Sequence, residues 1–211
     1  MENSLAAFRA AGRMRADAVE LDIHATKDGV LLVHHDDDVG GRPIAASTWT
    51  ELKGVRLANG EPLATLAEAL DVIHPMTAFV EVKGLDPRWD DALFAAFEGS
   101  PAPDRVAVHS FDHRIVRRLG RRRHDLPCGV LSASYPIDVI RMMADAGARR
   151  LWQHAALIDE ALVTQVHNAG AIIYAWTVDD PRAMQLLLAA GVDGLCTNHP
   201  DRARTAIDSA R

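Results

Sequence analysis

The chain has 211 residues, of which 48% are hydrophobic and 25% are charged, and its formal net charge is −6. This length and composition suit one globular domain with a sizeable core, and two small domains are the less favoured alternative. The negative charge argues against a nucleic-acid surface. No apolar run approaches the roughly 18 residues of a membrane span, and no signal peptide is visible, so we expect a cytoplasmic protein.

The first third of the chain predicts a helix, a strand, a hairpin turn and a short return strand. The helix begins near Leu5, with Asn3 or Ser4 as its N-cap. After a strand that contains Glu20 and Asp22, Thr26-Lys27-Asp28-Gly29 predicts a hairpin turn, because Gly29 can adopt a positive φ. The return strand follows directly, and the stretch from Gly40 to Pro62 is expected to be irregular.

From Thr65 onward, helices and strands alternate. Thr65 and Glu68 predict a capping box at the start of a helix that ends near Ile73. The later strands are expected at 79–83, 105–109, 128–131, 150–153, 171–176 and 192–196, and the helices at 89–97, 112–123, 137–146, 158–168, 181–190 and from about 200. This alternation predicts an α/β fold with a parallel sheet. The number of repeats favours a (β/α)₈ TIM barrel over a doubly wound sheet, which normally carries a Gly-rich phosphate loop.

The number of predicted elements indicates that one strand is missing. About seven core strands accompany roughly eight helices, and the chain opens on a helix, whereas a closed barrel opens on a strand. We therefore expect one TIM-barrel domain over residues 1–211 whose first β-strand is absent from this chain. Residues 40–63 are expected to form a short insertion at the barrel mouth.

Charged residues alternate with apolar ones in two of the predicted strands. Because successive side chains of a strand point to opposite faces, Glu20 and Asp22 share one face, and Glu81 and Lys83 do the same. Three carboxylates that face one space require compensation. A divalent cation and a buried ion-pair network with Lys83 are equally favoured by this spacing.

Other candidate site residues are placed at the same mouth. His35 follows the return strand, and its ordinary pKa suits general acid–base catalysis, although a solvated loop histidine is an equally weighted alternative. His109 and His154, which end strands, are weaker candidates, and Trp176 is expected to wall a pocket. The arginine run at 121–123 is interpreted as a solvated helix end, because no aromatic residues interleave it.

An ordered set of motifs gives the chain a resemblance to a known family. The motifs are Glu20-Leu21-Asp22, Thr26-Lys27-Asp28-Gly29, His35-Asp36, Glu81-Val82-Lys83, Ser110-Phe111-Asp112, Trp176-Thr177-Val178, Gly191-Val192-Asp193-Gly194 and Thr197-Asn198-His199-Pro200. Each motif is weak alone, but the ordered set spans nearly the whole chain. It resembles the glycerophosphodiester phosphodiesterase family.

The resemblance implies a barrel enzyme that uses one divalent cation, Mg²⁺ or Ca²⁺, to hydrolyse a small-molecule glycerophosphodiester to glycerol 3-phosphate and an alcohol. It further implies a reaction through a cyclic phosphate, with the glycerol hydroxyl as nucleophile. Carried over to this chain, the implied roles are metal binding by Glu20, Asp22 and Glu81, phosphate contact by Lys83, acid–base catalysis by His35, and lining of the glycerol or leaving-group side by Phe111 and Trp176. We expect no nucleic-acid partner and no stable membrane insertion, and a homo-oligomer is left open.

One departure from the family pattern is large. The family begins with a strand that ends in His-Arg-Gly, which supplies a second acid–base histidine and a phosphate-clamping arginine, and no His-Arg-Gly occurs in this chain. The family's Pro-Glu-Asn-Thr corresponds here to Met1-Glu2-Asn3-Ser4. We favour a true start upstream of Met1, where a signal peptide could also lie, over a short form with poor activity. Coding DNA upstream of Met1 distinguishes the two.

Two other functions remain as alternatives. One is a catalytically impaired barrel that binds phosphate or a phosphodiester without turnover, motivated by the missing His-Arg pair. The other is a phospholipid-cleaving relative similar to the phospholipase D toxins. It is disfavoured because residues 40–63 are mostly polar and offer no exposed apolar loop.

Overall fold

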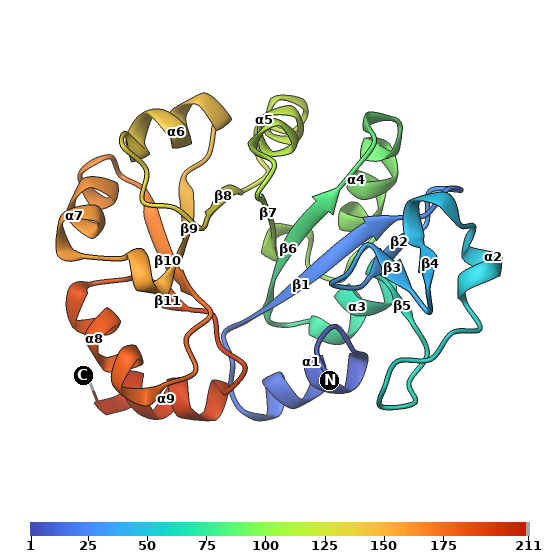
Figure 1. Cartoon of the computed structure of the whole chain (residues 1–211), viewed down its shortest axis with the longest axis horizontal. Helices are drawn as coiled ribbons and strands as arrows, with labels where there is room; N and C mark the ends of the chain where they lie inside the picture. Colours follow the sequence, from blue (N-terminus) through green and yellow to red (C-terminus); the bar gives the residue numbers. More distant parts are fainter. Residues whose placement is uncertain (210–211) are drawn as a thin grey trace. The chain divides into compact units, whose positions relative to one another are not determined.

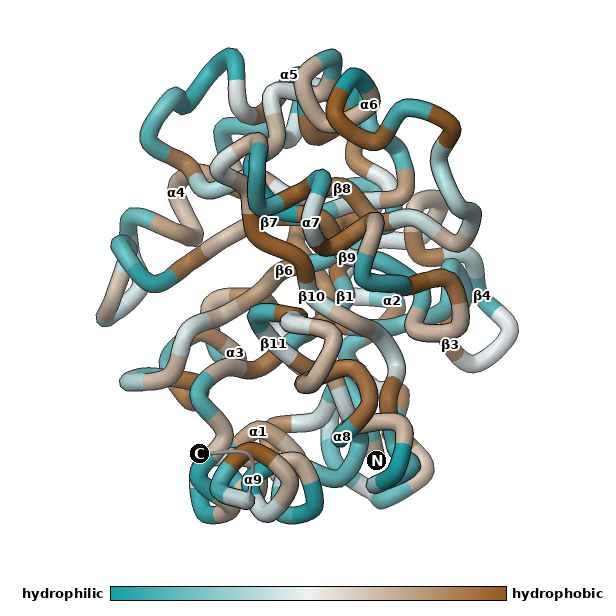
Figure 2. Tube along the Cα trace, turned by 90° about the vertical axis from the view of Figure 1, so that its left-hand side faces the viewer, coloured by the Kyte–Doolittle hydropathy of each residue, from teal (hydrophilic) through white to brown (hydrophobic). Residues whose placement is uncertain are grey.

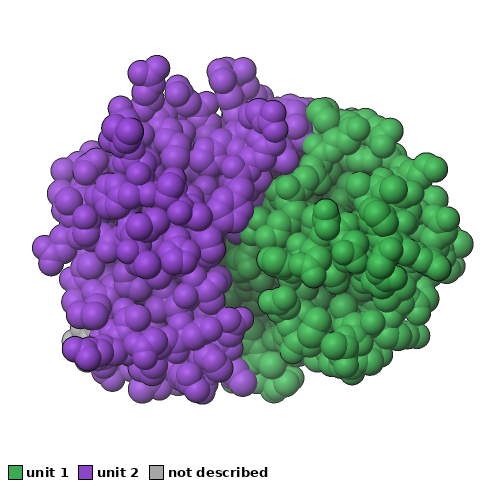
Figure 3. Space-filling model, in the orientation of Figure 1, with its two compact units in different colours: residues 1–13, 17–107 green, residues 14–16, 108–211 purple. Residues whose placement is uncertain are grey.

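A computed structural model describes residues 1–209 of the chain and divides it into two units (Figure 3). The first unit contains residues 1–13 and 17–107, and the second contains residues 14–16 and the chain from Val108 onward. The single domain over residues 1–211, with 40–63 as an insertion, stays a prediction.

The first unit contains a small mixed sheet and the helices that pack on it (Figure 1). Its elements are α1 (Leu5–Arg13), β1 (Ala18–Ala25), β2 (Leu31–Val33), β3 (Asp38–Val39), β4 (Arg42–Pro43), η1 (Ile44–Ala46), α2 (Trp49–Leu52), β5 (Ala64–Thr65), α3 (Leu66–Ile73), β6 (Thr77–Gly84), η2 (Pro87–Trp89), α4 (Asp90–Glu98) and η3 (Pro103–Arg105). Within this unit the strand order is β6-β1-β2-β5, with β1 parallel to β6 and antiparallel to β2. Asp22 lies directly opposite Glu81 in the β1–β6 register.

The second unit contains a parallel sheet whose strands alternate with helices. Its elements are β7 (Val106–Ser110), which begins in the last residues of the first unit, α5 (His113–Arg122), β8 (Cys128–Ser132), α6 (Val139–Ala146), β9 (Arg150–His154), η4 (Ala155–Leu157), α7 (Glu160–Asn168), β10 (Ile172–Trp176), α8 (Pro181–Ala190), β11 (Gly194–Leu195) and α9 (Pro200–Ser209). The strand order is β11-β10-β9-β8-β7, and these neighbouring strands run parallel to one another. Brown, hydrophobic stretches along β7 and β8 are visible in Figure 2.

Local sequence signals explain several element boundaries. The predicted capping box is confirmed, because Thr65 Oγ1 accepts from the Glu68 N–H while the Glu68 carboxylate accepts from the Thr65 N–H. The predicted hairpin turn is also confirmed, since the Gly29 N–H donates to the Thr26 carbonyl at 3.0 Å and Gly29 has a φ of 86°. From residue 65 the expected helices and strands all occur, although the last strand is shortened to Gly194–Leu195.

The irregular stretch expected over 40–62 requires correction. It contains β4, η1 and α2, and a local hydrophobic cluster holds it together. The cluster consists of Leu32, Val39, Ile44, Leu52, Leu57 and Leu63, with Trp49 and Val55 packed against it. These apolar residues follow neither a helical nor a strand period, so periodicity alone did not predict their association.

Helices that could cross a membrane are absent from residues 1–209, because none of the helices there is both long enough and apolar enough.

Candidate active site

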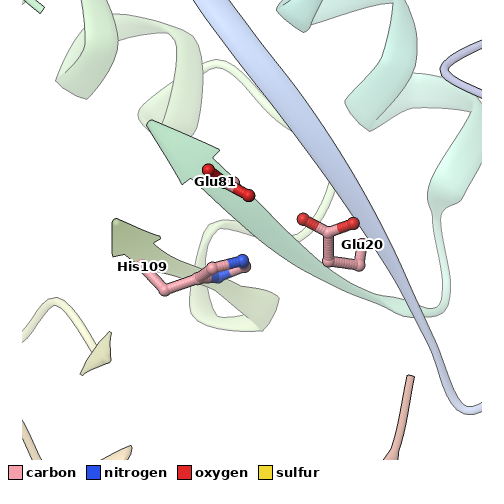
Figure 4. A group of neighbouring side chains, drawn as sticks. All are labelled: Glu20, Glu81 and His109. Atoms are coloured by element: carbon pink, nitrogen blue, oxygen red, sulfur yellow. The ribbon is translucent and has the colours of Figure 1, made fainter. Parts of the chain in front are cut away.

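Neighbouring strands β1 and β6 bring three carboxylates and one ammonium together in the first unit. The Lys83 Nζ lies 3.0 Å from Asp22 Oδ1 and 2.9 Å from Glu81 Oε1. A carboxylate oxygen of Glu20 lies within 4.8 Å of a ligand atom of Glu81, and Figure 4 shows these side chains on their adjacent strands. We call Glu20, Asp22, Glu81 and Lys83 the carboxylate cluster.

Burial and mutual repulsion perturb the acids of this cluster. Burial first, and then the negative charge of Asp22, raise the pKa of Glu20 from 4.5 to about 8, although Lys83 opposes this shift. Burial also raises the pKa of Glu81 against the effect of its hydrogen bond with Lys83. Burial works against the charge of Lys83, but its contacts with Glu81 and Asp22 outweigh this effect and raise the lysine pKa.

The composition of the cluster fits a divalent cation. Three carboxylates and one ammonium carry a formal charge of −2 when all are ionised, so Lys83 leaves negative charge uncompensated. Burial is the main cause of the raised pKa of Glu20, and the neighbouring charge of Asp22 adds to it. The donors are all carboxylate oxygens, which suit hard cations such as Mg²⁺ and Ca²⁺. The ion-pair network expected as the alternative is also present, since Lys83 contacts both Asp22 and Glu81.

Asn3 is a site residue that the sequence pattern did not identify. Its Nδ2 donates to Asp22 Oδ2 at 2.7 Å, and its Oδ1 accepts from the Asp22 backbone N–H at 3.0 Å. Ser4 caps α1 instead, because its Oγ accepts from the Ala7 N–H. The sequence feature that could have identified Asn3 is the match of Met1-Glu2-Asn3-Ser4 to the family's Pro-Glu-Asn-Thr. Asn3 therefore fixes the orientation of the Asp22 carboxylate.

Replacement of Asn3 by glycine is expected to lower the free energy of unfolding by about 2 kcal/mol, because a buried carboxylate loses a donor. Glycine is the suitable replacement, since Asn3 has a φ of 51° that alanine would adopt only with strain. Urea denaturation measures the change. Asn59→Gly is the matched control, because the Asn59 hydrogen bonds are exposed. Equal destabilisation by the two variants would refute the positioning role of Asn3.

His35 lies after β2, in the same unit as the carboxylate cluster. Its Nδ1 is 2.8 Å from Asp36 Oδ1, and this hydrogen bond raises the pKa of His35. The charges of Lys83 and Asp22 act on the pKa of His35 in opposite directions, since Lys83 lowers it and Asp22 raises it. The His35 side chain is 55% exposed, so its ring is accessible for proton exchange.

Phe111 and Trp176 lie together in the second unit. Their ring centroids are 5.5 Å apart in an edge-to-face arrangement, and the His154 ring meets Trp176 edge-on at 5.2 Å. The Trp176 Nε1 is buried and has no acceptor among residues 1–209. His109, the other weak candidate of this unit, is buried and stacks on Trp152 at 4.4 Å. The aromatic residues predicted to line a pocket are thus one contiguous group.

Comparisons with known proteins agree with one another. A sequence model described as the glycerophosphoryl diester phosphodiesterase family matches residues 1–202. A glycerophosphodiester phosphodiesterase of Caldanaerobacter subterraneus subsp. tengcongensis is 30% identical over 95% of this chain and 89% of its own length. A probable glycerophosphodiester phosphodiesterase 2 of Mycobacterium tuberculosis is 28% identical over 97% of this chain and 84% of its own.

Solved structures give the same result. A crystal structure of a glycerophosphodiester phosphodiesterase from Parabacteroides distasonis superposes with a TM-score of 0.89 and 25% identity, over 99% of this chain and 91% of that chain. A phosphodiesterase of Oleispira antarctica in complex with the product sn-glycerol-3-phosphate has a TM-score of 0.86 at 22% identity, over 98% of this chain and 91% of that chain. The predicted fold class, a (β/α)₈ barrel of the phosphodiesterase type, is confirmed.

Proposed function

The chain belongs to the glycerophosphoryl diester phosphodiesterase family, and from this membership we propose that it hydrolyses glycerophosphodiesters to glycerol 3-phosphate and an alcohol. The observation that carries the proposal is the carboxylate cluster, in which Lys83 lies within 3.0 Å of both Asp22 and Glu81. The likeness to the Oleispira antarctica phosphodiesterase, whose structure contains sn-glycerol-3-phosphate, supports the proposed product. Such a reaction belongs to glycerol and lipid metabolism.

Glu20, Asp22 and Glu81 are the residues that would hold one divalent cation, Mg²⁺ or Ca²⁺. When bound, the cation supplies Lewis-acid stabilisation of the charge that develops on the phosphoryl oxygens. Asn3 holds the Asp22 carboxylate in place through its hydrogen bond at 2.7 Å. Lys83 contributes a partly exposed ammonium that contacts phosphate as a point charge.

His35 is proposed to move a proton at the scissile phosphodiester. The Asp36 carboxylate raises its pKa and therefore favours the protonated ring, which can donate a proton to the departing alkoxide oxygen. Phe111 and Trp176 are proposed to line the glycerol or leaving-group side with their contiguous rings. A cytoplasmic location remains an expectation, and the oligomeric state is left open.

The proposal is tested by the release of glycerol 3-phosphate from glycerophosphocholine with Mg²⁺ or Ca²⁺ present. His35→Gln is expected to lower kcat about 100-fold, because general acid catalysis is lost. His34→Gln is the matched control, since the adjacent ring only contacts the Asp36 backbone carbonyl. A chelator is expected to abolish release. Turnover that resists the chelator, or an equal loss in His34→Gln, would reject these roles.

A second candidate is a barrel that binds phosphate or a phosphodiester without turnover. It is favoured by one observation, which is that the ammonium of Lys83 is partly exposed and can contact an anionic phosphate without any acid–base step. Calorimetry with glycerol 3-phosphate and Mg²⁺ would then give a binding isotherm while no alcohol is released from glycerophosphocholine. Hydrolysis by the 211-residue chain excludes this candidate.

A further inference from the structure

Positive charge is concentrated on helix α5 of the second unit. Residues 112–123 contain six arginines and one aspartate, whereas the whole chain has a net charge of −6, so the remainder is strongly acidic. The helix buries its apolar residues and leaves Arg114, Arg117 and Arg121 exposed to solvent. Among these three, Arg114 also donates to the Asp112 carboxylate at 2.7 Å. We call the exposed side of α5 the basic face.

The arginines of the basic face share one region of the surface of α5. A shallow hollow of about 460 Å³ is lined by Arg114, Arg117, Arg118, Arg121 and Arg122. Arginines three and four residues apart on a helix repel one another, and the helix dipole offsets this repulsion only in the last turn. An anionic surface placed against the hollow would relieve this repulsion.

Exposed apolar side chains also occur in the segment that leads into α6, the helix that neighbours α5. Tyr135, Ile137 and Ile140 are 43%, 107% and 36% exposed, and they belong to the loop between β8 and α6 and to the first turn of α6. Helices α5 and α6 are neighbours within the second unit (Figure 1). The ring of His113, the first residue of α5, lies 2.9 Å from the Leu131 carbonyl, which brings the start of α5 to the end of β8.

We propose that the basic face and the apolar loop residues Tyr135, Ile137 and Ile140 form a docking surface for anionic phospholipid membranes. Arginines beside protruding aliphatic and aromatic side chains are the combination that lies at a headgroup boundary. A nucleic-acid surface would interleave aromatic residues with the arginines, which α5 does not do.

Membrane docking is a separate activity from the proposed hydrolysis. It also changes the earlier inference that the chain lacks an exposed apolar loop. The absence of an exposed apolar loop was inferred from residues 40–63 alone, whereas the structure exposes apolar residues at 135–140. The surface is peripheral, because residues 1–209 contain no helix able to cross a membrane. It would hold the chain where phosphodiesters of membrane origin are released.

Co-sedimentation of the full chain with vesicles tests the proposal. Vesicles of equimolar phosphatidylcholine and phosphatidylglycerol are expected to bind the chain, and vesicles of pure phosphatidylcholine are expected not to bind it. Removal of charge in Arg117→Gln/Arg121→Gln is expected to weaken binding about fivefold per arginine. Added salt is expected to weaken it further, because exposed charges are screened. Ile137→Ser is expected to weaken binding several-fold without changing its salt dependence.

The matched control is Arg182→Gln/Arg202→Gln, which removes two exposed arginines from α8 and α9. The proposal is overturned if this control weakens vesicle binding as much, or if pure phosphatidylcholine vesicles bind equally well. It is also overturned if single-stranded DNA competes the chain off anionic vesicles at equimolar phosphate. All variants are expected to release glycerol 3-phosphate from soluble glycerophosphocholine at the unmodified rate, so failure of docking leaves the proposed hydrolysis intact.

Discussion

Lys83→Met is expected to lower the free energy of unfolding by about 3 kcal/mol and to lower the rate of hydrolysis by about 10²- to 10³-fold. The side chains of Asp22 and Glu81 are both largely buried, and the ammonium of Lys83 contacts each of them within 3.0 Å. Methionine preserves much of the volume of lysine but leaves two carboxylates facing each other without a positive charge. The variant also removes the point charge proposed to contact phosphate.

Urea denaturation in the presence of a chelator measures the stability change, and glycerol 3-phosphate release measures the rate change. Lys53→Met is the control, because Lys53 is an exposed lysine at the end of α2. We expect that control to change stability by less than about 0.5 kcal/mol. A divalent cation is expected to restore part of the stability lost in Lys83→Met, since the cation would neutralise the same carboxylates as the missing ammonium. Identical behaviour of the two lysine variants would contradict the proposed role of the cluster.

The metal-free chain is expected to lose stability as pH rises from about 4.5 to about 8, and Glu20→Gln is expected to remove most of this loss. The folded state raises the pKa of Glu20 from 4.5 to about 8, so in this window the folded state retains a proton that the unfolded state releases. The sign follows directly, because the unfolded state binds fewer protons and stability then falls with pH. The slope is at most about 1.4 kcal/mol per pH unit.

Glu20 keeps partial contact with solvent, so screening places the measured slope below that limit. Unfolding free energies of the unmodified chain and of Glu20→Gln are measured at several pH values with a chelator present. Each series gives the slope of stability against pH. Glu160→Gln controls for the loss of an exposed carboxylate. Added Mg²⁺ or Ca²⁺ is expected to stabilise the unmodified chain most at the alkaline end, where Glu20 is ionised, and to stabilise Glu20→Gln less. Parallel slopes for the unmodified chain and Glu20→Gln would show that Glu20 is not the titrating group.

Much of the candidate site followed from strand periodicity. The alternation of charged and apolar residues predicted that Glu20 and Asp22 share a face and that Glu81 and Lys83 do the same, and the structure brings these four side chains together. Periodicity is sufficient for this purpose because a β-strand sends every second side chain to the same side. It did not show that a single ammonium contacts both Asp22 and Glu81, which depends on the β1–β6 register.

Two contacts were beyond local sequence reasoning. Asn3 was one of two candidates for a helix cap, but its side chain pairs with Asp22, nineteen residues along the chain. The apolar residues of the 40–63 segment gave no periodic signal, and only their association with Leu32 explains why the segment is ordered. In both cases the partner is distant in sequence. Secondary-structure propensity and hydrophobic periodicity are local properties, so they do not predict such contacts.

The sequence alone determined the alternation of helices and strands, the helix caps, and the membership of a phosphodiesterase family, because these depend on local rules and on an ordered set of motifs. Tertiary structure decided which carboxylates Lys83 contacts, where Asn3 donates its hydrogen bond, and that Ile137 is exposed in the loop before α6. Those features depend on strand register and on the packing of distant segments. Both are settled by the burial of the whole core and not by any short stretch of chain.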